Sequence, residues 1–472
     1  MHHKISKLLL PVFLGLLYAL LIIAMLPLKY FLAIVLFLFI IFLFIVSRDK
    51  TLYITAFLLF FTAVDRRKPL VFSPYSQEQA GITVFLVFLF ISVVYIIVRQ
   101  KHIPIDLKKE RKLIILYCCY IGICLLISLQ NALLISFSFF GALRYFSLVL
   151  IILFWERVSK RVSEETLHKY LLILFLIGAF EGILAIAEVF FHVNMSYLWR
   201  NLDTAIIYHE KFAQAGGTFG GYTSLGHYLG ILFPFIFAIY FYRKSKLKLI
   251  CLILTGLGFF LSYARIAWLG AFIGVLIIVF IISKRRILSL KRLFIFLATS
   301  IILTVVILLP FYQTFIKVTD ALLLKRGDTL GSRIETYITA WKIIKDSNFL
   351  GIGLNNYREV MFQSYAYSAR YIEIAHNGYL VVLAESGLIG LILFLTVYIY
   401  LLVLGFRFLK QSIKGSLGFY ALIGMIGSII SFFIGNILNM TIDYNSVMNL
   451  FWNIIAIGLA YGLYKKHQFK SP

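Results

Sequence analysis

Long apolar runs separated by short polar segments dominate this 472-residue chain. A helix needs about 20 mainly apolar residues to cross the hydrocarbon core of a bilayer. Fourteen runs approach or reach that length, although the third is short and the fifth and sixth are nearly contiguous. The runs lie near 8–27, 30–47, 51–63, 81–98, 113–129, 133–155, 170–191, 224–242, 247–264, 266–283, 293–311, 387–406, 417–437 and 446–464. Because lipid offers no partners to backbone polar groups, such spans fold as helices. The runs therefore predict an all-α polytopic membrane protein with 12–14 transmembrane helices.

The composition excludes the other broad classes of protein. Hydrophobic residues make up 62% of the chain and charged residues 14%, whereas a soluble domain is about 45–50% apolar and about 25% charged. The four cysteines lie in apolar runs without zinc-ligand spacing to a histidine. A soluble enzyme, a disordered chain and a secreted disulfide scaffold are thus excluded.

The net charge of +25 follows from the expected membrane topology. If the N-terminus is cytoplasmic, the cytoplasmic segments hold 29 of the 45 Lys and Arg residues but only six of the 20 acids. This is the excess of positive charge that cytoplasmic loops carry. We therefore expect both termini in the cytoplasm, and no nucleic-acid partner is needed to explain the charge.

Two outer segments are long enough to form structure of their own. They divide the chain into N-terminal spans (1–191), an outer loop (192–223), central spans (224–311), a large outer loop (312–386) and C-terminal spans (387–472). In the large loop, apolar residues recur at helical spacing and predict a helix that ends near residues 346–348 and lies on the outer leaflet or caps the bundle. Its expected apolar face consists of Ile334, Tyr337, Ile338, Trp341 and Ile344.

Several cations lie outside the cytoplasmic segments. Arg66 begins a basic cluster on the outer side, and Arg144 lies within an apolar run, where a charge is costly and usually faces a partner or a cavity. Arg144 can pair with Glu181 or Glu188, which both lie in the seventh run. Arg265 lies between two runs, where its side chain can reach a ligand or extend to the membrane interface.

The chain lacks the motifs of several familiar enzymes. It contains no phosphate-binding Gly-x-x-x-x-Gly-Lys-Ser/Thr loop, no His-Glu-x-x-His, no Asp-x-Asp and no Gly-x-Ser-x-Gly. What remains on the outer side is Arg, Lys and His without an obvious metal. Arginine suits phosphate, and His376, just before a span, can act as a base or donate to an anion. Such a site can hold a lipid diphosphate and stabilise it as a leaving group.

Three stretches resemble the O-antigen ligase/O-antigen polymerase superfamily. The strongest covers residues 375–391 and begins Ala375-His376-Asn377-Gly378-Tyr379. It is similar to the His-Asn-x-Tyr-Leu…Glu-x-Gly…Gly segment that ends the family's large periplasmic loop. The others are residues 331–333 with Trp341 and the 349–357 turn, and residues 262–265, which resemble the family's Ser-x-Ser-Arg. A weaker match covers residues 216–220.

The resemblance implies a GT-C-like glycosyltransferase that uses no metal, nucleotide or other cofactor. Such enzymes take an undecaprenyl-diphosphate-linked glycan at the outer face of the bacterial inner (cytoplasmic) membrane. A ligase passes the glycan to lipid A–core, and a polymerase passes it to a second lipid-linked glycan. Family members often carry Arg before the glycine pair at 216–217. Here Gln214 takes that position, and the nearest cation is Lys211.

These inferences give each candidate residue an expected role. We expect a ligase that transfers O-antigen in lipopolysaccharide biosynthesis. The first alternative is a polymerase of exopolysaccharide or O-antigen. The alternative from another class of protein is a transporter of the same lipid-linked glycans. The half-to-half repeat that many transporters show is not apparent. His376 is the expected catalytic residue; the expected diphosphate contacts are Arg265, Lys211 and Arg333; the expected supporting residues are Asn377, Tyr379, Glu385, Arg66 and Arg144.

Overall fold

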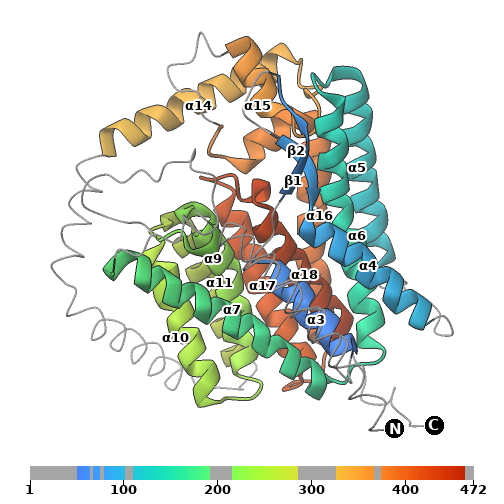
Figure 1. The fold of residues 1–472 in the computed structure, drawn as a ribbon, viewed down its shortest axis with the longest axis vertical. Coiled ribbons are helices and arrows are strands. Elements are labelled where there is room, and N and C mark those ends of the chain that lie inside the picture. The colour runs from blue at the N-terminus through green and yellow to red at the C-terminus, as the bar shows by residue number, and fades with distance from the viewer. Residues whose placement is uncertain are drawn as a thin grey trace, which may run out of the picture.

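A computed structural model describes residues 50–63, 67–74, 79–100, 110–191, 215–219, 221–284, 326–365 and 374–462 (Figure 1). The predicted runs at 8–27, 30–47 and 293–311 lie outside the described residues. The helices and strands, in chain order, are α3 (Lys50–Phe61), β1 (Arg67–Phe72), β2 (Gln79–Thr83), α4 (Val84–Arg99), α5 (Arg111–Asn131), α6 (Ile135–Ser159), α7 (Glu164–Phe190), η1 (Gly217–Phe219), α9 (Tyr222–Tyr240), α10 (Lys246–Leu261), α11 (Arg265–Lys284), α14 (Arg326–Asp346), α15 (Tyr357–Val360), the π-helical turn η3 (Met361–Tyr365), α16 (Gly378–Gln411), α17 (Leu417–Gly435), η4 (Thr441–Asp443) and α18 (Asn445–Gly462).

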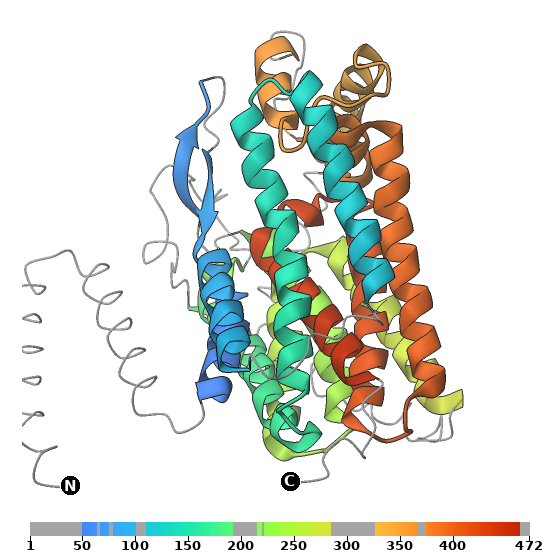
Figure 2. The same cartoon turned by 90° about the vertical axis from the view of Figure 1, so that its right-hand side faces the viewer.

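The predicted all-α polytopic membrane architecture is confirmed. Within the described ranges, seven helices are long and apolar enough to cross a membrane, namely α5, α6, α7, α9, α11, α16 and α17, and α4 contains a shorter apolar helix. The fifth and sixth runs form separate helices, because the backbone leaves the helical conformation between Asn131 and Ile135. Figure 2 shows α5, α6 and α16 side by side along the long axis of the bundle.

A short β-hairpin was not predicted from the sequence. Strands β1 and β2 pair antiparallel, with Arg67 opposite Thr83 and an irregularity between Pro69 and Val71. Proline has no N–H to donate to a ladder, so a break in the register there is expected. The hairpin leads directly into α4, whose first turn is capped by the Thr83 hydroxyl accepting from the Leu86 N–H at 3.1 Å.

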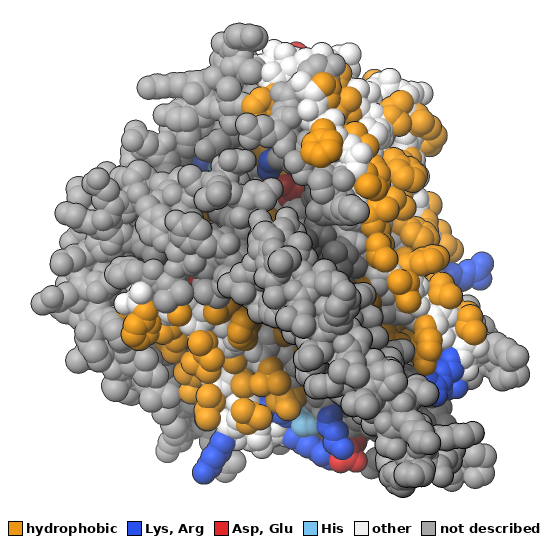
Figure 3. Space-filling model, in the orientation of Figure 1, with side chains coloured by type: hydrophobic (Ala, Val, Ile, Leu, Met, Phe, Trp, Pro, Cys, Tyr) orange, Lys and Arg blue, Asp and Glu red, His pale blue; other side chains and the backbone are white. Residues whose placement is uncertain are grey.

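The loops with the charge excess meet at one end of the bundle. Arg161 donates to the carbonyl of Arg99, and Arg243 forms an ion pair with Glu165 at 3.1 Å. In Figure 3 a group of Lys and Arg side chains lies along this lower edge, below a band of hydrophobic side chains. Helices α14 and α15 lie at the opposite end (Figure 1). The predicted inner and outer segments therefore separate to opposite ends of the molecule.

Small residues let the spans approach closely, as is typical of helix pairs in membranes. A Cβ added to Gly274 of α11 would lie 2.5 Å from the carbonyl oxygen of Gly427 in α17, and one added to Gly182 of α7 would lie 2.1 Å from the Leu254 carbonyl oxygen in α10. Helix α17 contacts α9, α11, α16 and α18 and thus occupies the centre of the bundle. The membrane core is accordingly built on backbone contact as well as on side-chain packing.

The turn after α14 is bound to a break in α16. Helix α16 is non-helical at Gly387, with φ +64° and ψ −173°. There the Leu388 N–H donates to the Phe349 carbonyl at 3.0 Å, and the Ile352 N–H donates to the Ala384 carbonyl at 2.9 Å. These backbone hydrogen bonds position the outer helices on the membrane bundle.

Helix α14 ends at Asp346, where the spacing predicts it to end, and the face that it packs against the protein is not the predicted apolar face. Thr336, Ala340, Ile343 and Ile344 are buried, whereas Ile334, Ile338 and Trp341 are 58%, 49% and 43% exposed. The smaller Thr336 and Ala340 permit a close approach to the rest of the outer cluster, so the bulkier side chains point away from it. Of the five residues predicted to form the apolar face, Ile344 is fully buried, Tyr337 is half-buried and the other three are exposed, so the placement of this face on the outer leaflet stays a prediction.

We predict that Gly351→Ala destabilises the protein by more than about 2 kcal/mol. Gly351 has φ +94°, and a Cβ there would lie 2.6 Å from the backbone nitrogen of Gly387. Thermal unfolding in a detergent micelle measures the effect. Gly122→Ala is the control, because its Cβ would meet nothing within 4 Å. Gly415→Ala isolates backbone strain, since φ is +81° but the space is open. Equal midpoints for Gly351→Ala and Gly122→Ala would contradict the packing described above.

Candidate functional site

The connection between α17 and α18, residues 436–444, joins three parts of the outer end. The Gly378 N–H donates to the carbonyl of Asn436 at 2.9 Å and to that of Asn439 at 3.0 Å. The Thr441 hydroxyl lies 3.3 Å from Nδ1 of His227 in α9. Asp443 forms ion pairs that are described below. This connection therefore links the start of α16 to α9 and to the outer helices.

His376 precedes the capped start of α16. The Asn377 side chain accepts from the N–H groups of Tyr379 and Leu380 at 2.9 and 3.0 Å, as an N-cap residue does. The Tyr337 hydroxyl of α14 donates to the His376 carbonyl at 3.0 Å. The His376 backbone is thus held from both sides, and its side chain is half-buried.

Arg333 lies one helical turn before Tyr337 on α14. Burial raises the pKa of the Tyr337 hydroxyl, and the nearby positive charge of Arg333 opposes that shift. The hydroxyl consequently stays protonated at neutral pH and keeps donating to His376. Tyr337, which was predicted as part of an apolar face, thus contacts the His376 backbone, and Arg333 acts on its hydroxyl through space.

Tyr379 and Glu385 have structural contacts. The Tyr379 hydroxyl donates to the Phe433 carbonyl at 2.8 Å. Oε1 of Glu385 accepts from the Tyr357 N–H at 3.2 Å, and the Glu385 carboxylate also accepts from the Asn355 N–H. Glu385 thereby fixes the turn between α14 and α15 on α16.

Arg144 does not pair with Glu181 or Glu188, so that alternative is wrong. Arg144 Nη1 lies 3.6 Å from Oδ1 of Asp443 instead. Glu188 accepts from the N–H groups of Gly216 and Gly217 at 2.8 and 2.9 Å, and Glu181 accepts from the Thr218 N–H at 3.0 Å and from its hydroxyl at 2.5 Å. The turn at 216–218 offers a row of donors at the outer end of α7, so these carboxylates need no cation.

Arg265 is exposed at the start of α11. It follows Tyr263, which adopts a left-handed φ of +54°, and Ala264, which packs against Gly226 in the first turns of α9. Burial raises the pKa of the Tyr263 hydroxyl to about 12, so this neighbour stays neutral. Within the part of the chain that the structure describes, Arg265 has no ion-pair partner.

Two predicted residues, Lys211 and Arg66, lie outside the described residues. Arg265 and Arg333 lie on different helices, α11 and α14, and none of the contacts among the described residues joins them. Across the described ranges, no group of three or more His, Cys, Asp or Glu side chains is arranged to hold a metal ion.

Comparison with known proteins now adds to this geometry. Residues 250–395 match the family model described as O-antigen ligase. The resemblance to this family is confirmed.

A match to a second protein supports the same family resemblance. The chain is 25% identical over 229 residues to the teichuronic acid biosynthesis protein TuaE of Bacillus subtilis (strain 168), a match that covers 46% of this chain and 45% of that protein. The match thus spans less than half of the curated relative. Together the two comparisons support a membrane glycosyltransferase-type role in polysaccharide assembly.

The O-antigen ligase match covers only part of the outer end. It includes Arg265, Arg333, His376 and Glu385, but it ends before Asp443 and begins after Arg144. Outside it, Arg144 rests on geometry, and Arg66 and Lys211 rest on the sequence alone.

Sequence reasoning missed the role of the α17–α18 connection. The sequence analysis assigned no role to Asp443, Arg358 or His227. A signal was available, because four polar residues interrupt two apolar runs there: Asn436, Asn439, Asp443 and Asn445. The distance along the chain from Arg144 hides the pairing.

We predict that Glu385→Gln keeps most of the stability and the transfer activity, whereas Glu385→Ala loses both. Glutamine retains one acceptor oxygen for a backbone N–H, but alanine leaves two buried donors unsatisfied, at about 1–3 kcal/mol each. Thermal unfolding and glycan-transfer assays on both variants make the comparison. A Glu385→Gln protein that is as stable as wild type but inactive would show that the carboxylate has a chemical role.

Proposed function

We propose that this protein is a glycosyltransferase that moves a glycan from an undecaprenyl-diphosphate carrier to an acceptor hydroxyl at the outer face of the cytoplasmic (inner) membrane. The observation that carries the proposal is the position of His376 and Arg333. Tyr337 of α14 donates to the His376 carbonyl, and Arg333 lies one turn earlier on the same helix, at the end of the bundle opposite the loops with the charge excess. By the positive-inside rule that end faces outwards. The family match over residues 250–395 covers both residues.

The donor diphosphate would bind to Arg265, Lys211 and Arg333. Arginine presents a planar, permanently charged fork that matches phosphate oxygens. These cations would stabilise the charge that develops as the carrier diphosphate leaves. Arg66 would add to the positive potential of this side. The proposed reaction needs no metal and no nucleotide.

His376 would accept the proton of the acceptor hydroxyl. The acceptor oxygen then forms a bond to C1 of the donor sugar, the bond from C1 to the diphosphate oxygen breaks, and the diphosphate keeps the electron pair. Attack opposite the leaving group inverts the anomeric centre. Asn377 holds the first turn of α16, so the position of His376 depends on that cap. Contact of His376 with the diphosphate is the alternative role.

Two acceptors fit this reaction. Lipid A–core would make the protein an O-antigen ligase. A second lipid-linked glycan would make it a polymerase, and the relative named for teichuronic acid biosynthesis favours polymer assembly. A transporter of the same lipid-linked glycans would use the same outer cations without chemistry.

We expect His376→Ala to reduce glycan transfer by about 10²–10³-fold without changing the unfolding midpoint. Transfer is measured with purified protein in lipid nanodiscs and a defined undecaprenyl-diphosphate oligosaccharide. His168→Ala is the matched control, because His168 contacts Lys248 near the opposite end of the bundle. Normal product formation by His376→Ala would show that His376 is not the catalytic residue.

The acceptor is identified by running that assay with and without lipid A–core and separating the products on a gel. A ladder from the donor alone indicates a polymerase. A shifted core band that appears only with the acceptor indicates a ligase. No transfer in either reaction, with His376→Ala behaving as wild type, would favour the transporter.

A further inference from the structure

His227 of α9 is a buried histidine at the outer end of the bundle, and the proposed reaction does not use it. The residue is 2% exposed, and its Nδ1 lies 3.3 Å from the Thr441 hydroxyl in the α17–α18 connection. A Cβ added to Gly435, the last residue of α17, would lie 3.0 Å from the same Nδ1. The imidazole ring is therefore packed against the end of α17 and against the connection that follows it.

Nδ1 is the atom through which this ring contacts the connection. Nε2 is buried and has no hydrogen-bond partner among the described residues. The face of the ring stacks on Tyr444, with the ring centroids 6.3 Å apart and the planes 23° apart. Tyr444 is itself hydrogen-bonded to Thr223 of α9. Because burial is unfavourable on the Nε2 side, the bond between Nδ1 and Thr441 is the polar contact that joins His227 to the connection.

The same connection holds the segment that contains His376. The Gly378 N–H donates to the Asn436 carbonyl at 2.9 Å, and a Cβ added to Gly378 would lie 2.3 Å from Asn436 Oδ1. Asn436 Oδ1 also accepts from the Ile442 N–H at 3.2 Å, one residue after Thr441. Gly378 follows His376 by two residues. A continuous set of short contacts thus leads from Thr441 to the His376 segment.

The residue before His227 contacts a different segment of the candidate site. A Cβ added to Gly226 would lie 2.2 Å from Cβ of Ala264. Ala264 directly precedes Arg265, with which α11 begins. Two consecutive residues of α9 therefore face two segments of the site, one with the expected diphosphate contact and one with the expected base.

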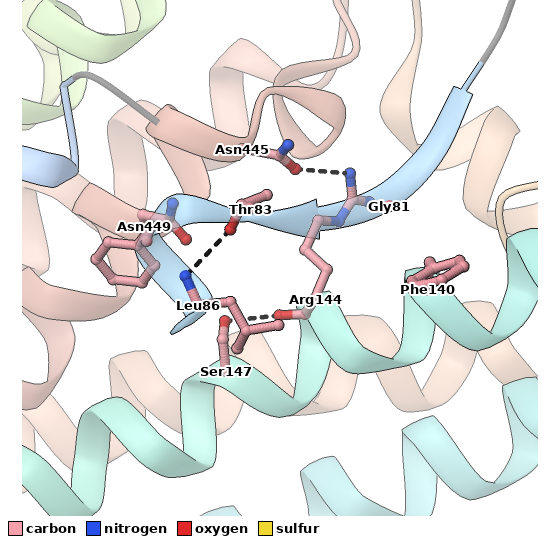
Figure 4. A pocket seen from close by; sticks show the side chains of 9 residues that line it. Gly81, Thr83, Leu86, Phe140, Arg144, Ser147, Asn445 and Asn449 are labelled. Carbon is pink, nitrogen blue, oxygen red and sulfur yellow. Dashed lines mark hydrogen bonds between the residues drawn. The ribbon is translucent and has the colours of Figure 1, made fainter. Parts of the chain in front are cut away.

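The end of the connection is held from another side. Asp443 forms ion pairs with Arg144 of α6 and with Arg358 of α15, at 3.6 Å each. Arg144 Nη1 also donates to the Asp443 carbonyl and to Asn445 Oδ1, each at 3.3 Å. Figure 4 shows the Arg144 side chain reaching from α6 towards Asn445. Because these contacts hold its end, the connection stays attached when a contact at its middle is lost.

We propose that His227 is a positioning residue for glycan transfer, which sets the separation between Arg265 and His376. This inference rests on the proposed function and deepens it. His227 acts through the connection and touches neither the substrate nor the reacting atoms. Reacting groups must lie about 3–3.5 Å apart, and a misplacement of about 1 Å can cost about 10²-fold in rate. The contact is therefore expected to affect turnover more than binding of the donor.

Two amide substitutions test which atom of His227 acts. The amide of asparagine occupies the position of Nδ1, whereas that of glutamine lies one bond further out, so His227→Asn keeps the bond to Thr441 and His227→Gln loses it. We expect His227→Gln to lower kcat for glycan transfer about 10–100-fold, with KM for the donor changed less than about threefold. His227→Asn should keep kcat within about threefold of wild type. A wild-type kcat for His227→Gln, or the same loss in both variants, would overturn the proposal.

Thr441→Val removes the same bond from the other side and keeps the shape of the side chain. It should lower kcat by a similar factor, and the double variant with His227→Gln should be no slower than either single variant, because both remove one contact. Additive losses would show that the two residues act separately and would overturn the proposal. Thr441→Val also tests the contact where His227→Gln does not fold. His168→Gln is the matched control at the opposite end of the bundle and should leave kcat unchanged.

A structural measurement separates this inference from the transferase. Hydrogen–deuterium exchange on the full chain in nanodiscs reports on the Gly378 N–H, which its bond to Asn436 protects. His227→Gln and Thr441→Val should speed exchange at Gly378 about tenfold or more, and His227→Asn should not. That result in a protein whose wild type transfers no glycan supports the positioning contact and excludes the transferase. Glycan transfer by the wild type, with unchanged exchange at Gly378 in both variants, supports the transferase and excludes the positioning role.

Discussion

Backbone contact between the turn at Gly351 and the break at Gly387 holds the outer helices on the membrane bundle. A side chain at Gly351 would collide with the backbone at Gly387, and a side chain at Gly387 would collide with the backbone of Phe349 and Leu350. The resulting hydrogen bonds fix the end of α14 and the start of α15 against α16. His376, Arg333 and Arg358 all lie on segments that depend on this contact. Backbone hydrogen bonds, and not the charges of the site, therefore position the candidate site.

The acidic residues at the outer end divide into two kinds. Glu181, Glu188 and Glu385 accept from backbone N–H groups and so hold turns in place. Asp443 pairs with two arginines instead. In a low-dielectric environment a carboxylate satisfied by amide dipoles is a fixed structural element. Asp443 joins α6, α15 and the α17–α18 connection through these two ion pairs.

The sequence predicted what depends on local pattern. Apolar runs predicted the spans, the charge count predicted which loops share an end, and the spacing in the large loop predicted a helix that ends at Asp346. The buried face of α14 was not predicted, because hydrophobicity alone does not reveal that Thr336 and Ala340 permit the close approach. The partner of Arg144 lies about 300 positions away in the chain, at Asp443. Such a pairing depends on how the helices assemble, and a single sequence carries no direct sign of it.

The exposed apolar side of α14 changes the surface of the molecule. Ile334, Ile338 and Trp341 continue, through Phe349 and Leu350, into the exposed apolar residues Leu388, Ile389 and Ile392 of α16. The band of exposed apolar residues around the bundle is thus taller on the α14 side. A bilayer that covers this band must thicken locally on the α14 side, or α14 must move towards the headgroup region. In a micelle that covers only the transmembrane helices, the apolar residues of α14 stay in water. Two molecules can bury these residues by associating through their outer ends.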